Sequence, residues 1–168
     1  MIRRLGRMIT LVALSVAVAA VANAVRPAGL KWYVSRIEVY PMADPGLKQY
    51  DITAEEVLRL SEQGTVHHDG LDRRVVIIDG RAEEKYRNGH IPGAINFPAH
   101  SAEEKAAELF QIADPMDFVI IYCGGGDCEE SKQVFDVLKA NGFPNLKLFL
   151  GGWQLWMDRH LPVAEGDP

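Results

Sequence analysis

The sequence is poor in cysteine, and it shows neither an internal repeat nor a strong compositional bias. Its 168 residues contain only Cys123 and Cys128, which are too few for the disulfide framework of a small secreted scaffold. They also lack the paired spacing and the histidine partners of a structural zinc site. Hydrophobic residues make up 48% of the chain and charged residues 24%, which is typical of a globular protein and not of a disordered or collagen-like one. The length suits one domain with its own core, but not two.

Positive charge is scarce after the first 36 residues. That leading segment has six basic side chains and no acidic one. The rest of the chain has 12 basic and 23 acidic side chains, which gives it a net charge of -11. A phosphate backbone would repel such a surface, and no stripe of basic and aromatic residues offsets the charge. We therefore expect no nucleic-acid partner.

A long run without charged residues, 8–25, follows three arginines at positions 3, 4 and 7. Its 18 residues are near the lower limit for crossing a hydrocarbon core of about 30 Å, and the run is longer than the core of a usual signal peptide. The pattern predicts an N-terminal hydrophobic helix that anchors the chain in a membrane in a single pass. Because the arginines favour the cytoplasmic side, the domain is expected on the extracytoplasmic, periplasmic side.

A cleaved signal segment remains an alternative to the anchor. Ala22-Asn23-Ala24 matches the small-x-small pattern that signal peptidase reads. Cleavage near Ala24 would leave an exported soluble protein. In either case the domain plan is a segment 1–25, a linker 26–49 that is rich in Pro and Gly, a domain 50–163 and a short tail 164–168.

The domain alternates β-branched runs with helical stretches. The runs expected as strands are Val75–Asp79, Ala94–Phe97, Phe118–Tyr122 and Leu146–Leu150. Capping boxes at Thr53/Glu56 and Ser101/Glu104 predict the starts of two helices, the second running to Ala113, and a third is expected over 130–141. Such alternation is typical of an α/β domain with a parallel sheet covered on both faces, where ligands bind beyond the carboxyl ends of the strands.

The loop that follows the central run carries the chemistry. It comprises Cys123, Gly124, Gly125, Gly126, Asp127, Cys128 and Glu129, and a helix is expected directly after it. Glycines permit positive φ angles, so the backbone N–H groups of a tight loop can converge on an anion, and the start of the helix adds positive potential. The anion would be the thiolate of Cys123 or the persulfide formed from it. A buried, inert thiol at the end of a strand is the alternative for this cysteine.

This arrangement resembles the rhodanese superfamily, and three further stretches match its pattern in order. Asp79-Gly-Arg81 with His90-Ile-Pro-Gly-Ala94 is similar to the first signature of the family, Gly142-Phe143 closes the helix after the loop, and Leu150-Gly-Gly-Trp153 is similar to the closing signature. The resemblance covers about residues 50–163. His90 is expected to lock a turn by hydrogen bonding rather than to act as an acid or base.

The resemblance implies a three-layer α/β fold with a five-stranded parallel sheet in the order 1-5-4-2-3. It also implies transfer of sulfane sulfur through a Cys123 persulfide, from a small donor or a persulfide-carrying protein to a thiol acceptor, with no metal or organic cofactor. Asp79 and Arg81 would lie at the rim of the pocket, although a purely structural ion pair is an equal alternative. The chain departs from the family because none of residues 124–131 is basic. This argues against phosphoryl chemistry and against efficient use of thiosulfate, and favours a neutral polysulfide or a protein-borne persulfide.

Cys128 adds two competing functions. Four residues separate it from Cys123, so it is a candidate resolving thiol that would convert a persulfide or sulfenic acid on Cys123 into a disulfide. The chain would then be a thiol redox protein. The missing basic residue also leaves open a catalytically silent module that uses the scaffold to recruit a partner at the membrane.

Overall fold

The computed structural model describes residues 45–126 and 129–166, all within one compact unit, Tyr40–Pro168. The elements are the 3-10 helix η1 (Pro45–Tyr50), α2 (Ala54–Gln63), β1 (Thr65–His68), β2 (Leu71–Asp79), α3 (Glu83–Arg87), β3 (Ala94–Asn96), the 3-10 helices η2 (Ala99–Ser101) and η3 (Ala106–Glu108), α4 (Leu109–Ile112), β4 (Phe118–Tyr122), α5 (Glu129–Ala140), β5 (Leu146–Phe149) and α6 (Gly152–Asp158). The predicted linker therefore ends in a short 3-10 helix, η1.

The sheet is mixed, so the prediction of an all-parallel sheet is wrong. Its five strands lie in the order β1-β2-β4-β5, and β3 also pairs with β2. The second half of β2 pairs in parallel with both β3 and β4, and β4 pairs in parallel with β5. The first half of β2 forms an antiparallel hairpin with β1. Asp69 and Gly70 connect the two strands with φ angles of 50° and 77°, as a two-residue hairpin turn requires.

The predicted order 1-5-4-2-3 is not confirmed. It requires a strand at the start of the domain, beside the last strand. At that place Asp51 forms one isolated parallel bridge with Leu148, and the N–H of Ile52 donates to the carbonyl of Leu148 at 3.0 Å. The pairing is too short to form a named strand, so this part of the order stays a prediction.

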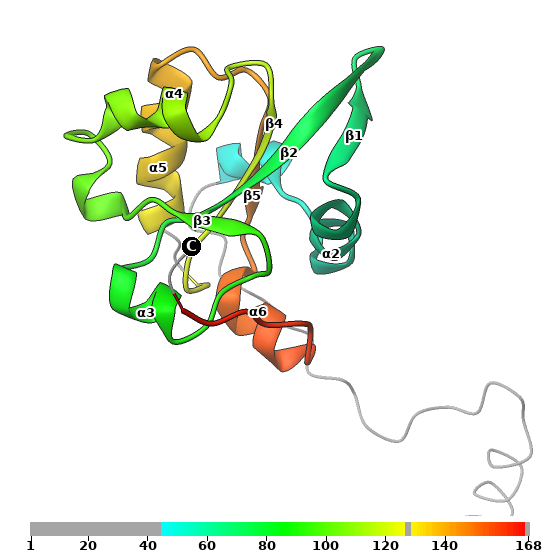
Figure 1. Ribbon diagram of the computed structural model, residues 1–168, viewed down its shortest axis with the longest axis vertical. Helices are drawn as coiled ribbons and strands as arrows, with labels where there is room; N and C mark the ends of the chain where they lie inside the picture. The colour runs from blue at the N-terminus through cyan, green and yellow to red at the C-terminus, as the bar shows by residue number, and fades with distance from the viewer. Residues whose placement is uncertain (1–44, 127–128, 167–168) are drawn as a thin grey trace, which may run out of the picture. The chain divides into compact units, whose positions relative to one another are not determined.

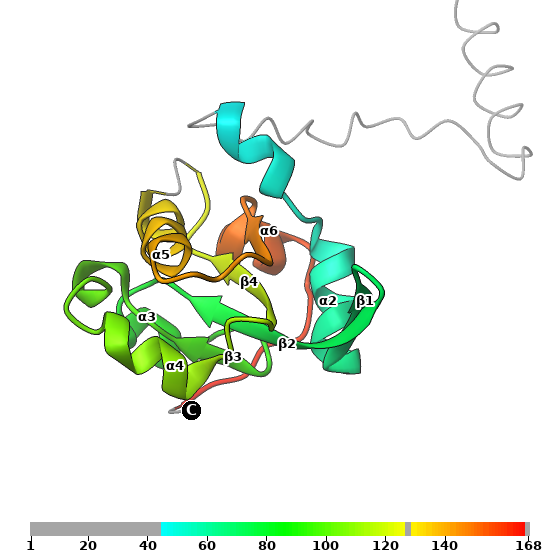
Figure 2. The same cartoon turned by 90° about the horizontal axis from the view of Figure 1, so that it is seen from above.

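Two apolar clusters cover the two faces of the sheet. Side chains alternate along each strand, so Ile121 of β4 packs with α5 while its neighbours Ile120 and Tyr122 pack with α2 and α6. Figure 1 shows α4 and α5 on one side of the strands and α2 on the other, and Figure 2 shows the same layers from above. All five residues of β4 are buried, which makes this strand the centre of the domain and explains its continuous apolar run.

The helix boundaries confirm part of the predicted capping. Thr53 accepts the N–H of Glu56 at 3.3 Å at the start of α2, but the carboxylate of Glu56 binds Arg59 instead of returning to the cap. The helix predicted over 101–113 is wrong, because η2, η3 and α4 divide that stretch. Ser101 donates its hydroxyl to the carbonyl of Pro98 at 3.3 Å and caps no helix.

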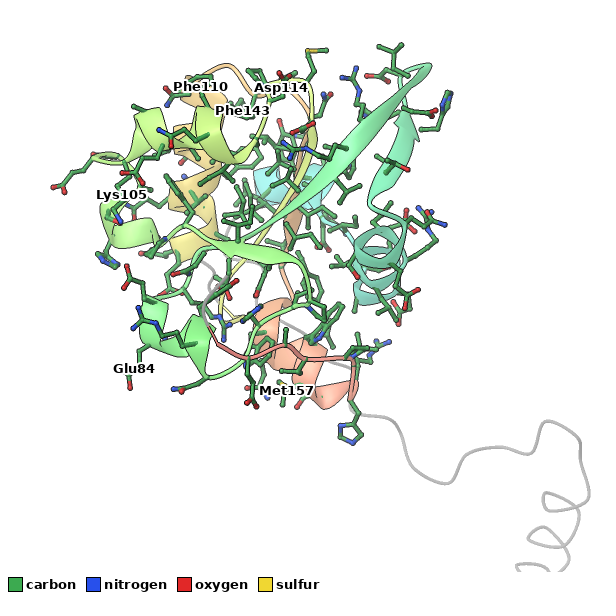
Figure 3. The ribbon with its side chains drawn as sticks, in the orientation of Figure 1. Glu84, Lys105, Phe110, Asp114, Phe143 and Met157 are labelled. Carbon is green, nitrogen blue, oxygen red and sulfur yellow. The ribbon has the colours of Figure 1, made fainter. Side chains whose placement is uncertain are left out.

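The broken stretch still contributes an apolar surface. Phe110 on α4 lies beside Phe143 (Figure 3), and the centroids of the two rings are 5.6 Å apart. The helix predicted over 130–141 is confirmed as α5, and Gly142 follows it with a φ of 87°.

No helix within residues 45–126 and 129–166 has the length and apolar character needed to cross a membrane. The predicted membrane segment, 8–25, lies outside those ranges. Its role stays a prediction.

The central strand provides a test of the core. Ile121 is fully buried, so Ile121→Ala should lower the free energy of unfolding by about 2–5 kcal/mol through lost burial and a residual cavity. Urea denaturation measures this change. Met116→Ala, just before β4 and 52% exposed, should cost less than about 0.5 kcal/mol. Equal losses in the two variants would contradict the placement of β4 at the centre.

Candidate active-site loop

The Cys123 loop begins where β4 ends. Cys123 itself is buried, with 2% of its surface exposed, while the three glycines after it are half-buried. Gly125 and Gly126 have φ angles of 104° and 81°, which confirms that this turn uses conformations that other residues rarely adopt. Asp127 and Cys128 lie outside the described residues. Glu129 is exposed and begins α5.

The carbonyl groups of the loop bind the start of α6. The N–H of Trp153 donates to the carbonyl of Cys123 at 2.8 Å, and the N–H of Gln154 donates to the carbonyl of Gly124 at 3.0 Å. The first N–H groups of a helix have no acceptor within the helix. Here two carbonyl groups of the loop are the acceptors. The first turn of α6 and the Cys123 loop are therefore joined by their main chains.

These two bonds decide where the N–H groups of the loop point. In a trans peptide unit the N–H lies opposite the carbonyl, and the described residues contain no cis peptide. The carbonyls of Cys123 and Gly124 both bind α6. The N–H groups of Gly124 and Gly125, which belong to the same two peptide units, therefore point away from α6. Among the described residues, no hydrogen bond uses the N–H of Gly124, Gly125 or Gly126. The loop can therefore offer these donors to an anion.

A buried ion pair lies beside the end of β4. The guanidinium of Arg81 donates to both carboxylate oxygens of Asp79, with Nη2 at 2.6 Å from Oδ2, and to the carbonyl of Gly89 at 2.7 Å. The hydroxyl of Tyr122 donates to Oδ2 of Asp79 at 2.6 Å and accepts the N–H of Ile91 at 3.1 Å. The exposed fractions of Asp79 and Arg81 are 0% and 2%, so the structure places both below the surface.

This environment shifts two proton equilibria. Burial alone would lower the pKa of Arg81, but the hydrogen bonds and charge of Asp79 outweigh it and raise that pKa above its ordinary value. Burial raises the pKa of Tyr122 far above its ordinary value, and the charge and hydrogen bond of Asp79 raise it further. Arg81 therefore stays charged and Tyr122 stays protonated across the physiological range.

Trp153 completes the contacts between the pair and the loop. The guanidinium carbon of Arg81 lies 4.5 Å from the centre of the Trp153 ring and 5.6 Å from that of Tyr122. The sequence did not assign Tyr122 or Trp153 to the site. Their positions directly before Cys123 and directly after the Gly-Gly pair were the signals that would have found them.

His90 holds a turn, as predicted. Its Nδ1 lies 2.9 Å from the carbonyl of Tyr86, its ring stacks on that of Tyr86 with centroids 3.8 Å apart, and its main chain pairs with Ala164. The amide of Asn96 donates to the carbonyls of Asp79 and Arg81 at 3.1 and 2.9 Å. These contacts are structural supports for the strand ends.

One groove lies on the neighbouring helix. It has a volume of about 680 Å³ and is lined by Glu103, Ala106, one face of α5 and Asn141, which follows that helix. Among the described residues of the predicted loop, only Glu129 lies on its wall, and Cys123 does not line it. Within the described ranges, no three His, Cys, Asp or Glu side chains are arranged to hold a metal ion.

Comparisons with known proteins identify the family of this domain. The model of the rhodanese-like domain family matches residues 53–159. The chain is 32% identical over 134 residues to the HTH-type transcriptional regulator Rv0324 of Mycobacterium tuberculosis, which covers 77% of this chain and 57% of the regulator. It is 27% identical over 114 residues to a putative mitochondrial thiosulfate sulfurtransferase of Schizosaccharomyces pombe, covering 62% of this chain and 75% of that protein.

A solved structure shows the same fold. The thiosulfate sulfurtransferase of Pseudomonas aeruginosa matches with a TM-score of 0.53 and 25% identity, over 69% of this chain and 20% of that one. The chain thus spans little more than half of the regulator and a fifth of this enzyme.

The buried pair can be tested by its effect on stability. Asp79→Asn keeps the shape of the side chain but leaves the Arg81 charge without its carboxylate, so it should lower the free energy of unfolding by about 3–5 kcal/mol. Tyr122→Phe removes one hydroxyl and leaves the N–H of Ile91 unpaired, which should cost about 1–3 kcal/mol. Chemical denaturation measures both changes.

The matched control for Asp79→Asn is Glu56→Gln, the same chemical change in the exposed pair with Arg59. Surface pairs contribute little, so this variant should unfold close to the unmodified protein. Similar losses for Asp79→Asn and Glu56→Gln would contradict a structural role of the buried pair.

Proposed function

Because the chain belongs to the rhodanese-like domain family, we propose that it is a sulfurtransferase or persulfide carrier in which Cys123 takes up and passes on sulfane sulfur. The donor is a small sulfur compound or a persulfide-carrying protein, and the acceptor is a thiol. The observation that carries the proposal is the position of Cys123 at the end of β4, next to glycine N–H groups that bind no described residue.

The geometry supports a double displacement. The Cys123 thiolate attacks the outer sulfur of the donor, the bond between that sulfur and the donor breaks, and the donor leaves with the electron pair. An acceptor thiolate then attacks the outer sulfur of the persulfide, and Cys123 leaves as a thiolate. Main-chain N–H groups directed at that sulfur would favour both anionic states, and no redox cofactor is needed because the electrons balance.

The charges near the loop support a donor with little negative charge. Glu129 and Glu130 lie in the first turn of α5. The buried cation, Arg81, is bound by Asp79 and is not exposed to attract an anion. A dianion such as thiosulfate therefore meets repulsion, whereas a neutral polysulfide or a protein-borne persulfide does not.

The intact mass of the protein after incubation with a donor tests this function. A neutral polysulfide should add the mass of one sulfur atom, thiosulfate should add it more slowly, and a thiol acceptor should remove it. Cys123→Ser should abolish the adduct because the nucleophile is lost. The matched control is Cys128→Ser, which changes the other cysteine of the chain and should keep the adduct.

Two outcomes would contradict the proposal. No adduct with any donor would exclude sulfur transfer and leave a binding role. Loss of two thiols under mild oxidation without persulfide formation would instead support the redox function, in which Cys123 and Cys128 form a disulfide.

We further propose that residues 8–25 place this domain at a membrane, on the extracytoplasmic side. The uncharged run and the three arginines before it support this placement. The full chain expressed in a bacterial host should remain with the membrane after washing with carbonate, and its mass should include residues 1–24. A soluble periplasmic chain that begins after Ala24 would contradict the anchor and support cleavage. A full-length chain in the cytoplasm would contradict both.

A further inference from the structure

The start of α6 connects the buried ion pair to the active-site loop. We propose that Trp153 is a positioning residue for Cys123: its main-chain N–H fixes the carbonyl of Cys123, while its indole ring is held by Arg81. The inference rests on the proposed function of this loop and adds a residue to its machinery. Figures 1 and 2 both show the start of α6 beside the segment that follows β4.

The main-chain contact sets the direction of the loop donors. Because Trp153 holds the carbonyl of Cys123 at 2.8 Å, the N–H of Gly124 must point away from α6. The bond from Gln154 to Gly124 does the same for Gly125. If α6 moved, both peptide units could rotate, and the two donors would no longer share a direction.

The approach of the two main chains requires glycine on both sides. A methyl group added at Gly152 would lie 2.5 Å from the carbonyl oxygen of Cys123 and 2.7 Å from the nitrogen of Gly125. A methyl group added at Gly125 would lie 2.8 Å from the carbonyl oxygen of Gly151. These contacts leave no room for a side chain, so the position of α6 and the conformation of the loop depend on each other.

The ring of Trp153 is the part of this contact that a substitution can change. Arg81 covers the ring at 4.5 Å, and Asp79 fixes Arg81 through two carboxylate oxygens. A cation that is buried and stacked on an indole ring interacts strongly with it. Arg81 therefore fixes the position of the Trp153 ring. The ring in turn keeps the first turn of α6 against the loop.

The effect of Trp153 on Cys123 is one of placement rather than charge. Among the described residues, the charged and titratable groups at the ends of β2 and β4 and at the start of α5 are Asp79, Arg81, Tyr122, Glu129 and Glu130. Gly152, Trp153 and Gln154, the first residues of α6, contribute no charge. A change in the reactivity of Cys123 after substitution of Trp153 therefore reports the orientation of the main chain.

The experiment measures alkylation of Cys123 by iodoacetamide against pH in the folded, full-length protein, read by peptide mapping so that only Cys123 is counted. The thiolate is the reacting form. Trp153→Ala should raise the midpoint pH of alkylation by about one unit, which makes the reaction about tenfold slower below the midpoint. Trp153→Phe keeps an aromatic ring for Arg81. Its midpoint should therefore exceed that of the unmodified protein by no more than about a third of the shift in Trp153→Ala.

Met157→Ala is the matched control on the same helix, because Met157 is exposed on α6, as Figure 3 shows. It should leave the midpoint unchanged. A Trp153→Ala midpoint that is unchanged or lowered in a folded protein would overturn the proposal, as would a Trp153→Phe midpoint equal to that of Trp153→Ala. If Trp153→Ala fails to fold, Trp153→Leu, which retains apolar bulk without an aromatic face for Arg81, takes its place with the same expected shift and the same contradicting results.

This measurement is separate from sulfur transfer. A chain that forms no persulfide but shows the expected shifts would contradict the proposed function and leave the role of Trp153 standing. A chain that forms the persulfide but shows no shift of the midpoint in any variant would contradict the role of Trp153 and leave the proposed function standing.

Discussion

The buried carboxylate of Asp79 is the constraint on which the site depends. It ends β2 without contact with water, so its charge must be balanced within the protein. Arg81 supplies the balancing charge, and the hydroxyl of Tyr122 supplies a further hydrogen bond at 2.6 Å. A single group thus joins the ends of two neighbouring strands, β2 and β4, just before Cys123.

A short series of contacts connects this ion pair to the Cys123 loop. Arg81 packs on Trp153, and Trp153 binds the carbonyl of Cys123. Parallel strands bring their carboxyl ends to one edge of the sheet, which is why residues far apart in the chain meet there. The result is a loop made largely of glycine whose conformation is decided by its neighbours, since glycine itself permits many conformations.

The same scaffold does not determine one activity. The relatives of this chain include a transcriptional regulator and sulfurtransferases, so the fold is compatible with more than one use. The charge near the loop of this chain is acidic at the surface: Glu129 and Glu130 begin α5, while the Arg81 cation is buried and bound by Asp79. The loop thus combines donors suited to an anion with surroundings that discourage anionic ligands.

Local patterns of apolar and turn residues were enough to predict the second half of β2, the strands β4 and β5, the helix α5, the turn at His90 and the glycine loop after Cys123. It did not determine the β1–β2 hairpin, although Asp69-Gly70 carried the signal, nor the division of the stretch 101–113. The burial of Asp79 and Arg81 and the bond from Trp153 to the Cys123 carbonyl became visible only in the folded chain. The contacts of this pair with Tyr122 and Trp153, and the bond from Trp153 to Cys123, join residues that are distant in the chain, and no local pattern encodes which of them will meet.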